Sequence, residues 1–343
     1  TGSLGIGGLG ISGEVSASSF KNRTEAYIID SNINAVDDWG KKVIVRAYQN
    51  TGVVVYAGSA AVGGVALSGT VNAIDVKNIT RAYIDQNSVV YALEGIEIWA
   101  QTNYGPLHTD KPGLIIAGAS IGVSGALAGA VSVVMMQNIN EAFVMNSDLY
   151  SQGFITILSV HNVKLKDITA AAAADAFAGT GGSVFVNSLE NLVRAFVESA
   201  NLNAVGAIEV IAKSRDDIDL VVGTGGAGTV AGAAGAVSLT LIETTTEAYI
   251  KGNINQDNRF KYDGIYAPGS GQRVLVLAEN ITNIDSTGGA LGAGVGLGVG
   301  AALDLISIQN RTVALIRTGS KIYTIGDVTV KAVSERNIDS KVY

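Results

Sequence analysis

The sequence contains no cysteine, only three prolines and only two histidines in 343 residues. Without cysteine the chain forms no disulfide and no thiolate metal centre, and two histidines are too few for a multi-histidine site. Collagen needs abundant proline beside glycine, so 43 glycines with three prolines exclude it and also argue against a disordered Pro/Gly linker. The sequence therefore predicts neither a cofactor nor a disulfide framework.

Charge is also scarce, because Asp, Glu, Lys and Arg make up 15% of the residues whereas hydrophobic residues make up 48%. Such a chain can bury a core. Its net charge of −7 argues against a nucleic-acid partner, whose phosphates require a basic surface. No signal peptide is recognisable at Thr1, and the C-terminus interrupts the repeat described below. We therefore expect a fragment of a longer protein.

Three stretches without charged residues, 113–137, 220–242 and 286–303, are long enough for membrane helices. They alternate small with larger residues at the period of two that is typical of strands, so a membrane partner is not expected. In 291–305 we expect the bulky residues to fill the interior. The alternating glycines would then face outwards, covered by another copy or an adjacent layer; the alternative is that they only relieve crowding at corners. These glycines are Gly292, Gly294, Gly296 and Gly298.

Self-similarity is the main signal in the sequence, because a three-part unit recurs six times. Each unit has a Gly/Ala-rich run, then a motif of the form Asn-x-Thr-x-Ala-aromatic-Ile, then a Val/Ile-x-Val/Ile-x-Ala/Ser motif. The motif alanines are spaced by 56, 60, 53, 53 and 66 residues: Ala26, Ala82, Ala142, Ala195, Ala248 and Ala314. The last motif begins at Val43, Ile96, Ile155, Ile208, Val274 and Val328.

Each part of the unit has the pattern of a strand. Val43, Val45 and Ala47 are expected to point inwards, as is Ala26, because the intervening positions carry charges in several copies. The aromatic residue after each alanine is then expected to face outwards. The asparagine of the motif also forms glycosylation sequons, as at Asn22, but we interpret it as a turn residue.

Strand units that cannot bury their faces alone must stack on their neighbours, which predicts an all-β, parallel β-solenoid over residues 1–343. Ala195, Ala212, Ala231 and Ala248 are 17 to 19 residues apart, which favours three short coils per repeat and about seventeen coils in all. One wide coil per repeat is the alternative, supported by alternating Glu and Arg before the motif alanines. Segments 103–114 and 256–271 are expected to leave the wall as loops.

Few residues qualify as candidates for chemistry. Asp216, Asp217 and Asp219 form the densest acidic cluster, which predicts either a weak calcium site or, more simply, a solvated turn. His108 and His161 are interpreted as surface residues, and no catalytic residues can be assigned. The outward aromatic row provides the remaining candidate contacts, either by stacking on glycans or another rod or by shielding the sheet: Tyr27, Tyr83, Phe143, Phe196 and Tyr249.

The strings GAVSVVMMQNINEAFV, GAVSLTLIETTTEAYI and GDVTVKA resemble the repeats of filamentous-haemagglutinin-like and leukotoxin-type bacterial surface proteins exported by type V pathways. The resemblance implies a right-handed parallel β-helix on the cell surface or outside the cell. It further implies a structural or adhesive role without catalysis, with host or matrix glycans, proteins or other copies as partners. A membrane-active toxin segment is the alternative, and a polysaccharide-active β-helix enzyme or phage tailspike is the second alternative.

Overall fold

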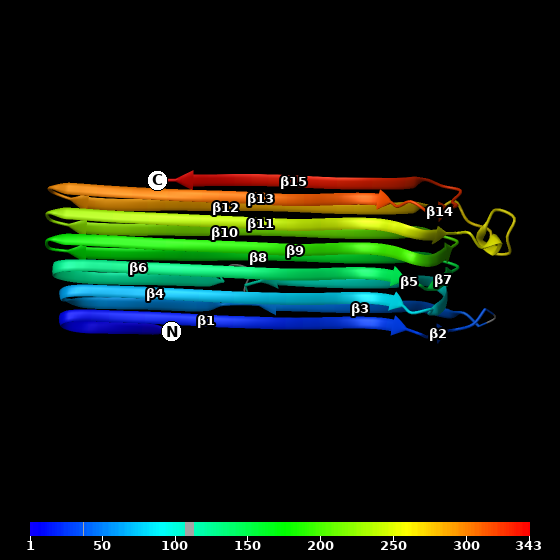
Figure 1. Cartoon of the computed structure of the whole chain (residues 1–343), viewed down its shortest axis with the longest axis horizontal. Helices are drawn as coiled ribbons and strands as arrows, with labels where there is room; N and C mark the ends of the chain where they lie inside the picture. Colours follow the sequence, from blue (N-terminus) through cyan, green and yellow to red (C-terminus); the bar gives the residue numbers. More distant parts are fainter. Residues whose placement is uncertain (37, 107–112) are drawn as a thin grey trace.

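The computed structural model describes residues 1–36, 38–106 and 113–343 and shows a parallel β-solenoid, flattened and built from long straight strands (Figure 1). In the described part of the chain, all fifteen strands are linked by hydrogen bonds into one continuous sheet. One short 3-10 helix, η1 (Asn258–Phe260), lies between β11 and β12. The strands are β1 (Gly2–Ile29), β2 (Asn32–Ile33), β3 (Gly40–Gly52), β4 (Val55–Asp85), β5 (Val89–Gly105), β6 (Leu114–Met145), β7 (Asp148–Ser151), β8 (Phe154–Asp175), β9 (Ala178–Ala204), β10 (Ile208–Gly228), β11 (Ala231–Ile254), β12 (Val274–Gly294), β13 (Leu297–Ile316), β14 (Lys321–Ile322) and β15 (Val328–Val342).

The sheet folds into three walls. Wall A contains most of β1, β4, β6, β9, β11 and β13, and wall B contains β3, β5, β8, β10, β12 and β15 (Figure 1). A narrow wall C joins them at the wide edge through β2, β7, β14 and short parts of their neighbours. At the opposite, narrow edge the chain turns directly from wall B to wall A, so the cross-section is a wedge.

Each repeat forms one wide coil, so the prediction of three short coils per repeat is wrong and the alternative is confirmed. Ala82 pairs with Ala26 and Ala142, and Ile155 pairs with Ile96 and Ile208, so equivalent residues of successive repeats are direct neighbours. Ala195 and Ala212, which suggested the shorter period, lie on walls A and B of the same coil. Their spacing reflects small residues facing across the core and is not the length of a coil.

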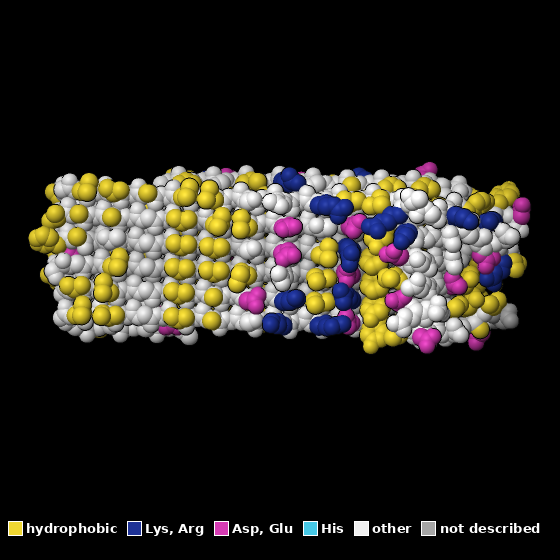
Figure 2. Space-filling view, viewed as in Figure 1, with side chains coloured by type: hydrophobic (Ala, Val, Ile, Leu, Met, Phe, Trp, Pro, Cys, Tyr) yellow, Lys and Arg dark blue, Asp and Glu magenta, His cyan; other side chains and the backbone are white. Residues whose placement is uncertain are grey.

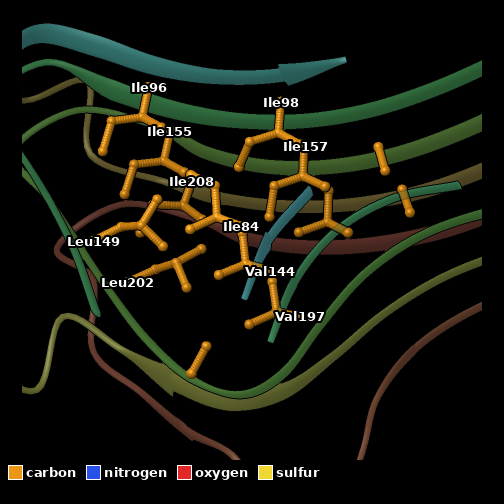
Figure 3. Packing of buried hydrophobic residues seen from close by; sticks show 14 of the residues in the cluster. Ile84, Ile96, Ile98, Val144, Leu149, Ile155, Ile157, Val197, Leu202 and Ile208 are labelled. Atoms are coloured by element: carbon orange, nitrogen blue, oxygen red, sulfur yellow. The ribbon is translucent and has the colours of Figure 1, made fainter. Parts of the chain in front are cut away.

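The wide edge contains the largest apolar core. Ile84, Ile96, Ile155 and Leu149 come from three walls and meet there, fully buried (Figure 3). The predicted inward residues of both motifs belong to this core, including Val43, Val45 and Ala47 and the motif alanines of the second to fifth repeats. Burial of these β-branched and leucine side chains supplies the main driving force for the wide part of the coil.

The narrow edge is closed by backbone contact between walls A and B. A Cβ atom added at Gly226 of wall B would overlap the carbonyl oxygen of Ala233 of wall A, and one at Gly118 would overlap the carbonyl of Gly129. Only small residues, mainly glycine, alanine and serine, face inwards between walls that lie so close, because a larger side chain would force the backbones apart. The inward cluster nearest this edge consists mainly of alanines.

This geometry reverses the predicted orientation of the glycines in 291–305. A Cβ atom at Gly292 would overlap the carbonyl of Val299, one at Gly294 the carbonyl of Leu297, and Gly298 faces Gly292. Their bulky neighbours point outwards instead, and Val295 is 91% exposed. The prediction that Gly292, Gly294 and Gly298 form the outer surface is therefore wrong, because the walls here are too close for larger inward residues, whereas Gly296 lies in the turn between β12 and β13.

The two predicted excursions lie at different places on the coil. Segment 256–271 leaves the wide edge as a loop that includes η1 and protrudes from the wall (Figure 1). Phe260 of this loop is fully buried and packs near Trp39, Tyr150 and Tyr266. The other segment, 103–114, starts within β5 and ends in β6, and its residues 107–112, with His108, lie outside the described residues.

Candidate functional site

The outer surface of wall A is sorted into bands that run along the stacking direction of the coils (Figure 2). Nearest the narrow edge is an uncharged band four outward positions wide, here called the apolar face. It includes several large exposed side chains, among them Ile11, Val15 and Leu127. Its residues are Ile11, Gly13, Val15, Ala17, Leu67, Gly69, Val71, Ala73, Leu127, Gly129, Val131, Val133, Thr180, Gly182, Val184, Val186, Ala233, Gly235, Val237, Leu239, Val299, Ala301, Leu303 and Leu305.

A row of outward glycines runs through the apolar face on the first five coils. Gly13 pairs with Gly69, Gly129, Gly182 and Gly235 follow on the next coils, and Ala301 completes the row on the sixth. A Cβ atom added at Gly182 or Gly235 would meet no atom within 4 Å, so these glycines are not required by the fold of their own chain. A smooth outward glycine row of the kind expected from the sequence therefore exists, but at other glycines.

Towards the wide edge the apolar face is followed by a mixed row with Ser19, Asp75 and Met135, and then by a charged row. It is basic on the first two coils, at Lys21 and Lys77, and acidic on the fourth and fifth, at Glu190 and Glu243 (Figure 2). All four side chains are exposed. Between them, Gln137 donates a hydrogen bond of 2.9 Å to Glu190. Asp75, one outward row closer to the narrow edge, marks the limit of the uncharged surface.

The row two outward positions beyond Lys21 alternates in charge, as predicted for one coil per repeat. Arg81 donates to Glu141 at 2.8 Å, and Arg194 of the following coil donates to the other oxygen of the same carboxylate. Arg317 likewise pairs with Glu247 at 2.8 Å. Because Glu141 is buried between two arginines, this ion-pair ladder ties three coils together through charge-assisted hydrogen bonds.

The predicted aromatic row is present on the outside of wall A. Successive rings are stacked with centroids 5.2, 4.7, 4.8 and 5.0 Å apart and interplanar angles of 20° or less. Exposure is 52% at Tyr27 but only 4% at Tyr249, where the Arg317 guanidinium covers the ring at 3.7 Å. Each inner ring turns its faces to the rings above and below, so a sugar cannot stack on those faces. The geometry supports shielding of the sheet.

The three aspartates of the acidic cluster do not converge. Asp216 points into the core, whereas Asp217 and Asp219 point outwards from β10 and pair with Arg215 and Lys166. All three lie within a strand, so the turn interpretation is wrong. Across the described residues no group of three His, Asp or Glu side chains is placed to hold a metal ion.

Asp217 and Asp219 line a shallow groove of about 660 Å³ on the outside of wall B. Lys166, Asp285 and Asp339 also line it, because they occupy the same register position as Asp219 on neighbouring coils. The groove is therefore a product of the repeat, with carboxylates on three successive coils.

A polar ladder that the sequence pattern did not reveal runs through the core. Asn22 donates to Asn78 at 2.9 Å, Asn78 to Asn138 at 2.8 Å, and Asn138 to Asn191 at 2.8 Å. The motif asparagines are therefore inward strand residues, and their interpretation as turn residues is wrong. Their side-chain amides bond in register between coils because each amide has both donor and acceptor groups.

Two titratable groups lie beside this ladder. Asp216 accepts hydrogen bonds of 3.1 Å from both Asn191 and Thr244, and burial raises its pKa to about 7. His161 is fully buried, which contradicts its interpretation as a surface residue, and burial lowers its pKa to about 4. Sequence reasoning missed both because a polar residue in an alternating strand looks outward unless the facing wall is known.

Comparison with known proteins adds no neighbour: no family model, no curated protein and no solved structure matches the chain. The resemblance to repetitive surface proteins therefore stays a prediction from the motifs. Within residues 1–36, 38–106 and 113–343, the structure contains no helix with the length and apolarity of a membrane span.

Proposed function

We propose that the chain is a structural segment of a bacterial cell-surface or extracellular fibre, in which stacked coils carry mechanical load. The observation that supports this role is the pairing of like positions along the stack. The asparagine ladder, the stacked rings and the ion-pair ladder each join a coil to the next through equivalent positions. A unit whose best partner is another copy of itself suits a repetitive stalk.

Extracellular location and adhesion rest on the motif resemblance and on the absence of cysteine. Antibodies raised against the chain should label intact cells of the producing organism, and external protease should remove the label. Labelling only after lysis would overturn the location.

Load bearing is tested by pulling the chain from its two ends in a force spectrometer. We expect high-force steps, each releasing one coil of 53 to 66 residues, or about 17–24 nm of extended chain. Gln137→Ala, which removes one exposed hydrogen bond outside the core ladder, is the matched control for Asn138→Ala, which breaks the ladder. Extension at low force without steps would contradict the proposal.

A membrane-active segment is the second candidate, because the apolar face exposes valine and leucine without any charge. Dye-filled vesicles of phosphatidylcholine and phosphatidylglycerol provide the test. Leakage at micromolar protein would support this candidate, whereas intact vesicles together with stepwise mechanical unfolding would support the structural role.

A further inference from the structure

The apolar face is large enough to form an interface. Its four outward positions span about 26 Å along the strands, and six coils span about 29 Å at the spacing of neighbouring strands, giving about 750 Å². A stable pair of proteins buries about 800 Å² per partner. Exposed apolar patches of this size mark contact sites, and the strands are straight and flat, so the rows stay in line over all six coils (Figure 1).

The four rows of the apolar face differ in height in a way that suits a second copy of the same face. The second row is glycine and the third is valine on each of the first five coils, which makes a groove beside a ridge. The outer rows compensate each other in size on the first, second and fifth coils. Large residues of the first row accompany small ones of the fourth, as with Ile11 and Ala17, and the order reverses at Ala233 and Leu239.

We propose that two copies of the chain pair through their apolar faces, related by a two-fold axis that runs parallel to the stacking direction of the coils. This operation keeps each coil opposite the same coil and reverses the strand direction. With the axis between the second and third rows, Gly182 lies opposite the partner copy's Val184, and the reverse holds by symmetry. The first row then lies opposite the fourth, so a large residue meets a small one on the first, second and fifth coils.

The opposite coil order fits this surface less well. An axis along the strands would place glycine row on glycine row and valine row on valine row. The two valine ridges would then hold the backbones apart and leave an unfilled channel along the glycines, which loses the contacts of close packing. In the proposed pairing the charged row that begins at Lys21 stays outside the apolar contact and in water. The pairing involves this face alone and does not depend on the proposed role in a fibre.

The first test places charge in the groove. Sedimentation equilibrium of the whole chain should show a dimer, and Gly129→Lys with Gly182→Lys should raise the dimer dissociation constant at least a hundredfold. Neither position has an atom of its own chain closer than 3.9 Å to an added Cβ, so the strand signal in circular dichroism should stay unchanged. The matched control is Gly223→Lys with Gly225→Lys, two outward glycines of wall B with nothing within 4 Å, which should dimerise like the parent.

The second test exchanges groove and ridge. Gly182→Val alone should weaken the dimer more than tenfold, because two valines then compete for one space. Adding Val184→Gly to the same chain should restore the dimer, since the new ridge lies opposite the new groove only when coil order is parallel. An unrescued double variant would overturn the proposed packing.

Three further outcomes would overturn the interface itself. The first is a parent chain that stays monomeric at 100 µM, a concentration far above the dissociation constants of standard-size interfaces. The second is a wall B control that dissociates as readily as the wall A variant. The third is a monomeric parent that co-sediments with phosphatidylcholine and phosphatidylglycerol vesicles and loses this binding with Gly182→Lys, which would assign the face to lipid.

Discussion

Large and small side chains alternate along the strands in both the wide and the narrow part of each coil. The large ones point inwards in the wide part and outwards in the narrow part. At the wide edge Ile155 and Ile157 point inwards and Thr156 outwards, whereas at the narrow edge Gly226 points inwards and Leu291, on the next coil, points outwards. The difference follows from the distance between the walls. Where wall C holds walls A and B apart, the interior must be filled by large side chains. Where the walls touch, the interior admits only small residues such as glycine, alanine and serine, and the large residues are left outside.

The strongest test of this comparison enlarges an inward glycine of the narrow part. Gly226→Val should lower the free energy of unfolding by about 3 kcal/mol or more, because the new Cβ would overlap a backbone carbonyl that cannot move alone. Urea titration followed by circular dichroism measures the change. The control, Gly223→Val, lies three residues away on the outward side with nothing within 4 Å, and should change stability by less than about 0.5 kcal/mol. Equal losses would contradict the assigned orientation.

Truncating a large side chain should lower stability more in the wide part than at the narrow edge, the reverse of enlarging a glycine. Ile157→Ala in the wide core should cost about 2–5 kcal/mol, because the residue is fully buried and its removal leaves a cavity (Figure 3). Leu291→Ala at the narrow edge, where the leucine is 71% exposed, should cost less than about 1 kcal/mol. Both values come from the same urea titration, and a larger loss at Leu291 would reverse the comparison.

Between the two parts, the polar core should respond to pH in two opposing ways. The pKa of Asp216 is raised from 3.8 to about 7, so the folded state holds this proton more tightly, and its contribution to stability is lost as pH rises from about 4 to 7. The pKa of His161 is lowered from 6.5 to about 4, so its contribution is lost as pH falls from about 6.5 to 4. In the parent these two slopes offset each other.

Single variants separate these slopes. Asp216→Asn should gain stability relative to the parent as pH rises through this window, by roughly 1.4 kcal/mol per pH unit. His161→Gln should gain relative to the parent as pH falls. Melting temperatures measured from pH 4 to 7 provide the comparison. Parallel curves for parent and both variants would show that the two groups keep their ordinary pKa values in the folded chain.

The smallest expected effect concerns the outside of the wide part. Phe143 stacks on a ring at each side, whereas Tyr27 at the end of the row has one ring neighbour. Each aromatic pair contributes about 0.5–1.5 kcal/mol beyond its buried area. Phe143→Leu should therefore destabilise roughly twice as much as Tyr27→Leu in thermal unfolding. Equal effects would indicate that burial alone, and not stacking, accounts for the row.

The sequence predicted those features that depend on the repeat itself. Equivalent residues such as Ala82 and Ala142 could be recognised as neighbours in a parallel β-solenoid because their motifs recur in fixed order. The outward row of rings followed from the same alternation. The coil length did not follow, because Ala195 and Ala212 carry the same residue type on two facing walls and thus imitate a shorter period.

What the sequence did not predict depends on contacts between walls. The inward orientation of Gly292 and Gly294 is imposed by the backbone of β13, which no local pattern in β12 contains. The buried states of His161 and Asn78 likewise depend on which residues face them from the opposite wall. The outward glycine row could have been found from its spacing of 56, 60, 53 and 53 residues, which repeats that of the motif alanines.

The register between coils also determines how this chain must fold. Each strand of walls A and B has its hydrogen-bonding partner 53 to 66 residues away, so no strand pair between coils forms until a whole coil has closed. Loop-closure entropy grows only with the logarithm of length, so a coil of 66 residues costs merely about 0.2 kcal/mol more than one of 53. We therefore expect nucleation of the first pair of coils to limit folding, after which the exposed edge strands pair with each later coil. Growth of this kind tolerates an excursion wherever pairing resumes in register after it, as it does on wall B at Leu114, the end of segment 103–114.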